Sequence, residues 1–460
     1  MSYQTEKLKQ EKVIRDPVHS HIYIQDQIIM DLINTTEFQR LRRIHQLGTT
    51  SLTFPGAEHT RFSHSLGVYE IVRRICNHFQ RNYPTQNGGQ DGLWDDHDRL
   101  VAECAGLLHD IGHGTYSHTF EHIFHTNHEE ITQAIITSKE TEVNQVLRQM
   151  GPNFPNQVAS VINKTYPNQQ VVQMISSQCD ADRMDYLLRD SYFTGAQYGN
   201  FDLDRILQVM RPYEHGICFK KSGLHAIEYY IVSRYQMYLQ VYFHPTSRSM
   251  EVILAHLLNR ARLIAQHPEQ YPEEFQPGLL QPFLTEQFDI TRDLTQYLQL
   301  DDGVLTTSFS GWRTFPDPIL ADLSTRFLDR KPFKSAQFTE ETKPLLAHLR
   351  QLVDAVGFDS TYYTATDNSY NQPYDVYDPT DQHPNAQIEL MEKDGSLIEL
   401  SQASLLVQTI TGRDVGDSRF FFPKEMFQPE AAGLFAETAT QFQSYIQNDH
   451  IIQPKESLHD

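Results

Sequence analysis

The chain has 460 residues, of which 39% are hydrophobic and 21% are charged, and its formal net charge at pH 7 is −21. This length allows a large buried core and predicts two or three subdomains. The acidic charge argues against strong binding to nucleic acid or to anionic membranes, and no apolar run approaches the roughly 18 residues of a membrane span.

The N-terminal part of the chain is predicted to alternate short elements with loops. Apolar residues recur at strand or helix spacing in several places, and Gly, Pro and Asn cluster between them. In chain order we expect an extended segment over 21–25, helices over 28–32 and 37–47, a loop over 49–59, a helix over 66–75 and a loop over 84–92.

The apolar stretch 100–108 predicts a helix that ends at His109-Asp110, and two short His-rich helices should reach to about residue 139. Later elements follow from helical periodicity, from proline clusters and from alternating residues around an Asp-Gly pair. We expect helices over 171–190, 229–239 and 250–265, a boundary over 268–282, an irregular excursion over 358–384 and a β hairpin over 388–400.

The predicted fold is therefore mainly α, with a small antiparallel sheet or hairpin in the C-terminal part. Three regions are expected: an N-terminal segment over 1–48, a helical core with a helical extension over 49–270, and an α+β subdomain over 271–460. The N-terminus is polar and lacks a signal-peptide core. Cys76, Cys104 and Cys179 have apolar neighbours and, like Cys218, belong to no CxxC motif, which indicates free thiols in a reducing cytoplasm.

Histidines and aspartates at three places in the chain are candidate metal ligands: His64, His109, Asp110 and Asp182. This layout suits one divalent metal held between helices, with positions left open for water and a phosphate. The His-Asp pair is informative because it closes an apolar stretch, whereas the same dipeptide lies in polar segments at His97-Asp98 and His459-Asp460. Two His and two Asp accept Fe, Mn, Mg, Zn or Ni, so the metal stays open.

Other polar residues near these ligands point to phosphate chemistry. Asp182, Tyr186 and Asp190 recur at i, i+4 and i+8 and share one helix face, for which the alternative is a solvent-facing acidic stripe. Arg61 lies three residues before His64 and Arg183 follows Asp182, so both could grip phosphate oxygens or form ordinary salt bridges.

The histidines after the metal pair favour proton transfer or a second metal, although a lone histidine is usually structural. They are His113, His118, His122, His125 and His128. A histidine held by a carboxylate such as Glu121 can serve as a general acid near neutral pH. Residues 40–43 and 220–221 are candidate cation clusters for an anionic ligand, for which the alternative is exposed, solvated basic side chains. Together these features fit a hydrolase of a phosphate ester or anhydride.

The chain resembles the HD superfamily of metal phosphohydrolases. More narrowly, it resembles the deoxynucleoside triphosphate (dNTP) triphosphohydrolases, which include dGTPase-like bacterial members and the member with an added SAM domain. The resemblance covers roughly residues 12–270, with motifs in the same order at similar spacing. The matching segments are 14–19, 37–42, 46–48, 54–57, 61–67, 109–114, 117–118 and 182–186. The region 49–270 would then be the HD-domain catalytic core.

This resemblance implies a role for each matched residue. The metal ligands would be His64, His109, Asp110 and Asp182. The acid-base group would be His113, Glu121 and His128, with His128 protonating the 5′ oxygen. The dNTP substrate would contact Arg61, His118 and Arg183 through its phosphates, Gln46 and Asp190 through the 3′ hydroxyl, and Tyr186 under the sugar. The implied products are a deoxynucleoside and intact triphosphate.

The resemblance also implies a homo-tetramer with a nucleotide effector, dGTP- or GTP-like, bound at the subunit interface. Lys12, Val13, Asn34, Gln39 and Arg42 match that site, and the weaker matches are Arg211 and Lys220. Relatives have an aspartate where this chain has Asn34. An amide offers one acceptor oxygen and no charge, which weakens the paired acceptance from a guanine edge.

Three other functions compete with this interpretation. One is another enzyme of the same superfamily, such as a phosphodiesterase with two metals or an oxygenase that uses the extra histidines. Another is a catalytically idle nucleotide sensor, which the presence of every proposed ligand and of the acid-base group argues against. The last is a structural helical protein, which would leave the Asp182-Tyr186-Asp190 face unexplained.

Overall fold

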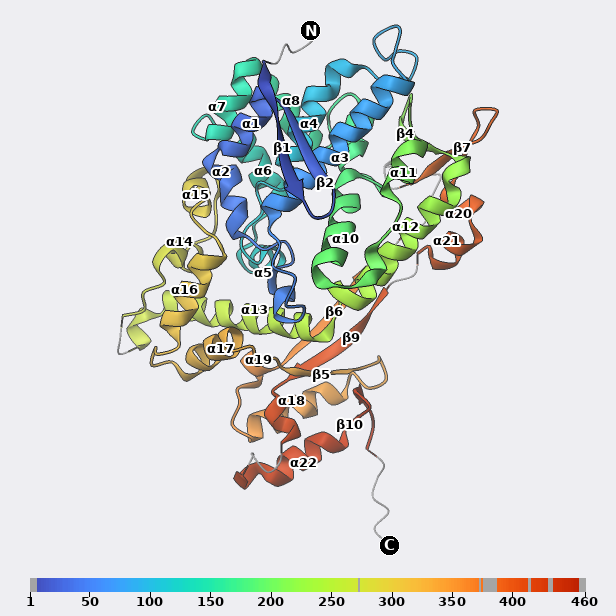
Figure 1. Cartoon of the computed structure of the whole chain (residues 1–460). Helices are drawn as coiled ribbons and strands as arrows, with labels where there is room; N and C mark the ends of the chain where they lie inside the picture. Colours follow the sequence, from blue (N-terminus) through green and yellow to red (C-terminus); the bar gives the residue numbers. More distant parts are fainter. Residues whose placement is uncertain are drawn as a thin grey trace.

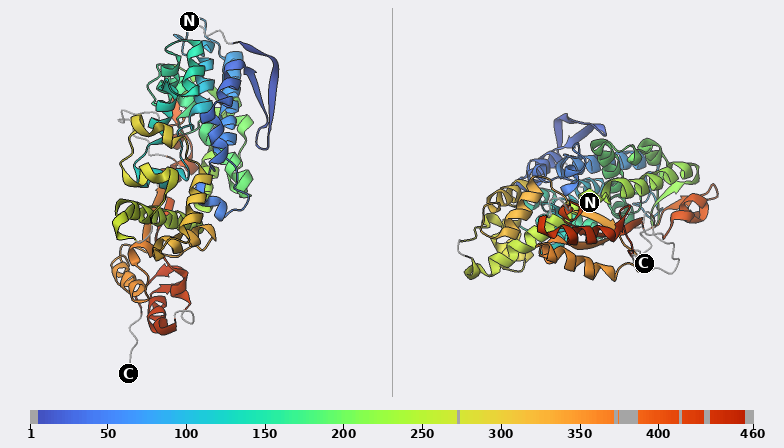
Figure 2. Two further views of the ribbon diagram at one scale, coloured as in Figure 1. Left: turned by 90° about the vertical axis from the view of Figure 1, so that its left-hand side faces the viewer. Right: turned by 90° about the horizontal axis from the view of Figure 1, so that it is seen from below.

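The computed structural model describes residues 6–271, 274–371, 374, 387–412, 415–428 and 433–454. The chain begins with an antiparallel hairpin of β1 (Lys7–Asp16) and β2 (Ser20–Asp26), which lies along the edge of the helical body (Figures 1 and 2). The predicted extended segment is confirmed inside β2. Its partner β1 was not predicted, because its residues are mostly polar and exposed and show no clear alternation.

After the hairpin come α1 (Gln27–Asn34) and α2 (Thr36–Arg40), then a 3₁₀ turn, η1 (Leu41–Arg43). The first helix is confirmed, but the prediction of one helix over 37–47 is wrong in its second half. Ile44 is extended, and its carbonyl accepts a hydrogen bond from the amide of Arg61. His45 pairs with Thr60 in an isolated bridge. Tertiary pairing with the segment before the next helix therefore overrides the helical periodicity.

Eight helices form the body around the candidate metal ligands. They are α3 (Arg61–Asn82), α4 (Arg99–Leu108), α5 (Ser117–Phe124), α6 (His128–Thr137), α7 (Glu142–Leu147), α8 (Phe154–Ile162), α9 (Gln169–Ile175) and α10 (Ala181–Thr194). Helix α3 packs against both α4 and α10. The contact with α4 is close because Gly106 has no side chain: a Cβ there would lie 2.9 Å from Val72. The predicted helices over 66–75 and 100–108 are confirmed.

The predicted single helix over 171–190 is two helices, α9 and α10, separated by residues 176–180. Asp180 ends the break: its carboxylate accepts a hydrogen bond from the amide of Arg183 at 2.7 Å and caps α10. Cys179 therefore precedes the helix rather than lying within it. Asp182, Tyr186 and Asp190 all fall inside α10, so they keep their shared face.

The rest of the chain surrounds this body. Its helices are α11 (Leu203–Val209), α12 (Leu224–Met237), which runs into the π turn η7 (Tyr238–Tyr242), α13 (Pro245–Gln266), α14 (Gln281–Thr285), α15 (Ile290–Tyr297), α16 (Asp302–Trp312), α17 (Pro318–Leu328), α18 (Leu345–Ala355), α19 (Ser360–Tyr363), α20 (Leu400–Ala403), α21 (Leu405–Ile410) and α22 (Ala436–Ser444). The predicted helices over 229–239 and 250–265 are confirmed as parts of the α12–η7 run and of α13. The mainly α prediction is also confirmed.

Two sheets lie beyond the hairpin. One has the order β3-β4-β7-β8 and contains β3 (Met210–Tyr213), β4 (Gly216–Lys220), β7 (Glu389–Met391) and β8 (Leu397–Glu399). The other has the order β10-β11-β5-β9-β6 and contains β5 (Lys334–Gln337), β6 (Ala365–Asn371), β9 (Val415–Phe422), β10 (Ile446–Gln447) and β11 (His450–Ile451). The predicted hairpin is confirmed as β7 and β8.

The predicted irregular excursion over 358–384 is wrong where it contains α19 and β6, and residues 375–386 lie outside the described part of the chain. Strand β6 was missed because four of its seven residues, one Ala, one Asp and two Asn, are of types depleted in strands; pairing with β9 holds the strand in place. The molecule is elongated, with its two termini at opposite ends (Figures 1 and 2). The division of the chain near residue 270 stays a prediction.

Candidate metal centre and active site

Three helices bring the four candidate metal ligands together. His64 lies in the first turn of α3, His109 and Asp110 follow the last residue of α4, and Asp182 lies in the first turn of α10. His64 Nε2 lies 3.1 Å from Asp182 Oδ1 and 3.8 Å from Asp110 Oδ2. His109 Nε2 lies 3.4 Å from Asp110 Oδ1 and 3.6 Å from Asp182 Oδ1. The four side chains thus point at one small volume.

The donor set fits a divalent cation. His109 Nε2 is buried and has no hydrogen-bond partner in the described structure, while its Nδ1 bonds the carbonyl of Gly106 at 2.9 Å. An orphaned ring nitrogen among carboxylates is costly without a ligand. Burial opposes a charge on His64, but Asp182 and Asp185 outweigh it and raise the pKa of His64 to about 10. The negative field that raises this pKa would also hold a metal ion.

A second layer of buried charges fixes the orientation of His64. Its Nδ1 lies 2.8 Å from Asp185 Oδ2, and the other oxygen of Asp185 lies 2.5 Å from His19 Nε2. Arg189 donates to Asp185 at 2.8 Å and to Asp16 at 2.8 Å. A carboxylate on the far ring nitrogen sets the tautomer and aims the other nitrogen at a metal. This supporting role was not predicted from the sequence.

The helix contact beside this layer depends on a glycine. A Cβ at Gly67 would lie 1.9 Å from Asp185 Oδ1 and 2.5 Å from Arg189 Nη2. The only trace of this requirement in the sequence is the Gly in His64-Ser65-Leu66-Gly67, one turn after the ligand. Spacing alone does not reveal that Asp185 faces it.

The three predicted acid-base residues also meet. His128 Nδ1 lies 3.1 Å from Glu121 Oε1, and the rings of His113 and His128 stack with centroids 3.8 Å apart. Burial and the nearby Arg61 hold the pKa of His113 well below its usual value. Burial also opposes a charge on His128, but Glu121 outweighs it and raises the pKa of His128. His113 therefore favours the neutral form and His128 favours the protonated form, which suits acid-base chemistry.

Arg40 was predicted to belong to a cation cluster for an anionic ligand, and this is wrong. Only 1% of the residue is exposed, and its guanidinium donates to the backbone carbonyls of His113 and Leu300, each at 2.9 Å. Its function is to fix the loop that carries His113. In the second predicted cluster, Lys221 pairs with Glu392.

A cavity of about 520 Å³ opens beside the metal centre. Eight of the predicted site residues line it: Gln46, Arg61, Asp110, His113, His128, Asp182, Tyr186 and Asp190. Helix α13 and the turn before it supply Tyr238, Tyr242, Phe243, Arg248 and Glu251. Both oxygens of Asp190 already accept hydrogen bonds, from His59 at 2.8 Å and from the hydroxyl of Tyr242 at 2.7 Å.

Buried arginines near the cavity have unused donors. The Nε atoms of Arg61 and Arg183 are buried without a hydrogen-bond partner in the described structure. Arg61 also donates to Asp110 at 2.5 Å, and Arg183 to Asp180 at 2.5 Å. Arg234 on α12 was not predicted. Its Nε is likewise unpartnered in the described structure, and its guanidinium lies 5.8 Å from the ring centroid of Tyr238 in the cavity wall. Its sequence context, Ser-Arg-Tyr-Gln, carries no motif. Helix α5 contains His118, whose side chain is not among those described.

The predicted effector residues fall into two groups. Lys12 and Val13 lie on β1, Asn34 ends α1, and Gln39 and Arg42 lie on α2 and η1. Arg42 Nε donates to Gln39 Oε1 at 2.8 Å, and its guanidinium lies 3.5 Å over the ring of Phe62.

The second group is Arg211 on β3 and Lys220 on β4. Both cations lie over the ring of Tyr83, at 5.3 and 5.5 Å from its centroid. The structure brings these two together on a different part of the single chain from the first group.

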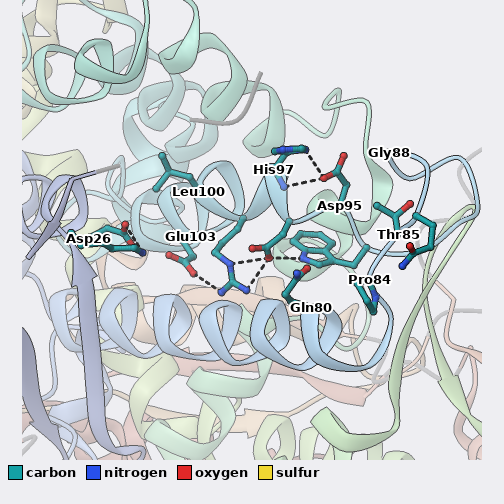
Figure 3. Close-up of a pocket in the computed structure, with 14 residues that line it drawn as sticks. Asp26, Gln80, Pro84, Thr85, Gly88, Asp95, His97, Leu100 and Glu103 are labelled. Atoms are coloured by element: carbon teal, nitrogen blue, oxygen red, sulfur yellow. Dashed lines mark hydrogen bonds and ion pairs between the residues drawn. The ribbon is translucent and has the colours of Figure 1, made fainter. Parts of the chain in front are cut away.

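A second cavity, of about 570 Å³, lies between the N-terminal hairpin and the ends of α3 and α4 (Figure 3). None of the predicted site residues is among those that line it. Its charged groups are largely paired with one another: Lys7 with Asp26, His97 with Asp95, and Arg99 with Asp96. Burial raises the pKa of Glu103 in its wall to about 7. This cavity is distinct from the candidate active site.

Comparison with known proteins agrees with this geometry. The HD-domain family matches residues 61–190, and the HD-associated region matches residues 201–274. The chain is 48% identical over 427 residues to the uncharacterized protein YwfO of Bacillus subtilis, covering 93% of this chain and 95% of that one. It is 29% identical over 290 residues to the deoxynucleoside triphosphate triphosphohydrolase SAMHD1 homolog of Dictyostelium discoideum, covering 58% and 53%.

Among solved structures, a phosphohydrolase from Bacteroides thetaiotaomicron matches with a TM-score of 0.75 and 28% identity, over 90% of this chain and 100% of that one. The class defined by fold and site is that of the HD phosphohydrolases. Within it, the chain belongs to the family that contains YwfO and resembles the dNTP triphosphohydrolases. No helix in the described part of the chain has the length and apolar character needed to cross a bilayer.

Proposed function

We propose that the protein hydrolyses dNTPs to a deoxynucleoside and inorganic triphosphate. The observation that carries this proposal is that one cavity joins a His-His-Asp-Asp metal site to two stacked histidines with opposite protonation preferences. Relatives named as dNTP triphosphohydrolases, in Dictyostelium discoideum and Gallus gallus, match over about half of the chain and support this substrate class.

His64, His109, Asp110 and Asp182 would hold a divalent cation. Such a cation, when bound, supplies a Lewis acid that polarises a phosphoryl oxygen and lowers the pKa of water. Asp185 keeps His64 in the tautomer that faces the cation, and the carbonyl of Gly106 does the same for His109.

The arginines would bind the triphosphate. Arg61 and Arg183 keep a buried, unpartnered Nε, and hydrogen bonds to phosphate oxygens would satisfy these donors. Arg234 offers a third such donor beside Tyr238. His118 remains a proposed phosphate contact from its place in α5. Arginine side chains held against the triphosphate stabilise the negative charge that develops on it during cleavage.

His128 would deliver the proton that the leaving 5′ oxygen needs. Its raised pKa favours the protonated ring, and Glu121 holds the Nδ1 side so that Nε2 is the donating atom. His113 stacks on this ring in its neutral form, so it adds no second positive charge to the pair.

The sugar would rest on the α10 side of the cavity. Each oxygen of Asp190 accepts one hydrogen bond and keeps a further lone pair, to which a 3′ hydroxyl could donate its single proton. The side chain of Gln46 lines the same cavity, and its amide N–H could donate to the 3′ oxygen. Tyr186 would pack under the ring and leave no room for a 2′ hydroxyl.

The proposal includes regulation by a nucleotide effector at the interface of a homo-tetramer. One subunit would supply part of that site, through Lys12, Val13, Asn34, Gln39 and Arg42. Arg211 and Lys220 from another subunit would supply further cations. Val13 is 49% exposed in the single chain, which suits a residue that contacts a ligand or another subunit.

A second candidate function rests on one observation. A second set of possible metal ligands lies close together: His113, Glu121 and His128. One ligand atom from each lies within 4.8 Å of the others, as an HD enzyme with two metals would require. A phosphodiesterase with two metals would therefore retain two equivalents of metal per chain. One equivalent, with full activity, favours the dNTP triphosphohydrolase.

Product analysis tests the proposal. The purified protein is incubated with each dNTP, singly and in mixtures, with Mg²⁺ or Mn²⁺, alongside Asp182→Ala and an Asp204→Ala control on the exposed face of α11. We expect deoxynucleoside and triphosphate from the protein and the control, and neither from Asp182→Ala. Activity only in mixtures would support the effector. Free phosphate or pyrophosphate, or no turnover in any mixture, would contradict the proposal.

A further inference from the structure

The active-site cavity extends to the first turns of α13, where it meets two charged side chains that the proposed chemistry does not use. Arg248 and Glu251 lie three residues apart on this helix, and both line the cavity. Next to them in the lining are the aromatic rings of Tyr242 and Phe243. This wall is therefore an aromatic surface with two ionisable groups beside it.

Arg248 is held mainly by the protein. Its Nε donates to Asp367 Oδ2 at 2.6 Å, and its Nη1 pairs with the carboxylate of Asp417. Its Nη2 donates to the backbone carbonyls of Asp367 at 3.1 Å and Asp417 at 3.2 Å. Only 1% of the residue is exposed. Arg248 therefore ties α13 to strands β6 and β9, and these contacts use four of its five N–H groups.

Glu251 is the ionisable group that remains on this wall. In the part of the chain that the structure describes, no hydrogen bond or ion pair reaches its carboxylate. The side chain is accessible to water, yet burial and the nearby Asp367 raise its pKa to about 7 against the opposing charge of Arg248. Its place in the cavity lining leaves this carboxyl open to a ligand.

This inference rests on the proposed function, which places the triphosphate at the metal centre and the sugar beside Tyr186 and Asp190. The part of the substrate that remains is the base, and Glu251 is the ionisable carboxyl of the cavity lining that has neither a partner in the described part of the chain nor a role in that placement. We propose that Glu251 reads the base and selects bases with an amino group over thymine. Adenine, cytosine and guanine each offer an exocyclic amino donor to a carboxylate, while thymine offers a single ring N–H flanked by two carbonyl oxygens.

A carboxylate opposite the right donor changes affinity by roughly tenfold or more, and Glu251 presents a carboxylate at a pH above its pKa of about 7, where the test is run. Glutamine at the same position can both donate and accept, so Glu251→Gln should lose discrimination while keeping the volume of the side chain. Leucine there would remove both functions. The matched control is Glu269→Gln, since the Glu269 side chain is 67% exposed and does not line the cavity.

The test is internal competition. Each of dATP, dCTP and dGTP is mixed with dTTP in one tube, so that any effector acts equally on both substrates, and the ratio of kcat/KM is read from the deoxynucleosides formed. We expect the protein and Glu269→Gln to prefer the amino-bearing bases. The ratio should fall roughly tenfold in Glu251→Gln and Glu251→Leu, with an unchanged thermal unfolding midpoint. Equal ratios in all four proteins, or a preference for dTTP, would overturn the inference.

Failure of the proposed function would look different. If the unaltered protein hydrolyses no dNTP, or if a Glu251 variant loses all turnover, binding of the four dNTPs is measured by calorimetry on the same proteins. A dTTP affinity that rises relative to the others in Glu251→Gln would support base reading without hydrolysis. The same affinity order in the protein and in Glu251→Gln would overturn it.

Discussion

At the scale of single residues, the sequence reveals the groups that carry chemistry better than the groups that hold them. His64, the His109-Asp110 pair and Asp182 can be found because metal ligands need particular side chains, and those side chains stand out in apolar surroundings. Asp185 and Arg189 could not be assigned a role, because that role depends on which buried group each one faces.

Asp185→Asn tests this supporting layer. The amide keeps the volume but no longer fixes His64 as a carboxylate does, and it removes the charge that Arg189 and His19 share. We expect metal affinity to fall ~10- to 100-fold. Equilibrium dialysis against Mn²⁺ measures it, with Asp204→Asn on the surface as the control. Unchanged affinity would remove Asp185 from the metal site.

His128→Ala should keep the metal and lose rate. The expected fall in kcat is on the order of 10²–10⁴, typical of a general acid. Metal content and kcat are compared with those of His225→Ala, whose side chain is 92% exposed. Loss of metal in His128→Ala would instead place this histidine among the ligands.

The pH dependence follows from the same residue. Glu121 raises the pKa of His128, so the protonated form required for catalysis is present below that raised pKa and is lost as pH rises through it. Glu121→Gln removes the charge, and the alkaline limb of the kcat profile should move to lower pH. An alkaline limb at the same pH in both proteins would show that His128 is not the acid.

At the scale of elements, periodicity predicts where most of the helices near the site lie but misplaces ends. The expected helix over 37–47 ends early because Ile44 and His45 are drawn into pairing with residues 60–61. The helix expected over 171–190 is broken because Asp180 caps a new helix. Neither the cap at Asp180 nor the long-range pairing of Ile44 and His45 was predicted from the sequence, because each depends on contacts that helical periodicity does not record.

Gly67→Ala should disturb the contact of α3 with α10. The added methyl would collide with Asp185, which is locked by Arg189, so we expect a loss of about 1–3 kcal/mol in unfolding free energy and weaker metal binding. Gly311→Ala is the control, because that helical position in α16 has open space and should gain about 0.5–1 kcal/mol. Urea unfolding measures both. Equal effects would show that the contact is not tight.

At the scale of the whole molecule, the N-terminal hairpin and the η1 turn lie at the surface, where another subunit could reach the proposed effector residues. The sequence predicts this surface only through the family resemblance, since Val13 and Arg42 form no pattern of their own. The two groups of effector residues could not be joined from the sequence, because an interface between subunits leaves no periodicity in one chain.

Arg42→Ala tests the proposed interface. The substitution removes a cation held by Gln39 and Phe62, so we expect weaker nucleotide-induced assembly in light scattering and weaker activation, with metal content unchanged. Arg81→Ala, at the exposed end of α3, is the control. An unchanged activation curve would remove Arg42 from the effector site.

The most direct test of the account is the fate of water oxygen. The reaction is run in H₂¹⁸O with a dNTP mixture, and the ¹⁸O content of each product is measured by mass spectrometry. Attack on the α-phosphorus, with His128 protonating the 5′ oxygen, predicts one ¹⁸O in the triphosphate and none in the deoxynucleoside. Label in the deoxynucleoside, or in pyrophosphate or phosphate released directly, would contradict the arrangement of substrate on which the account rests.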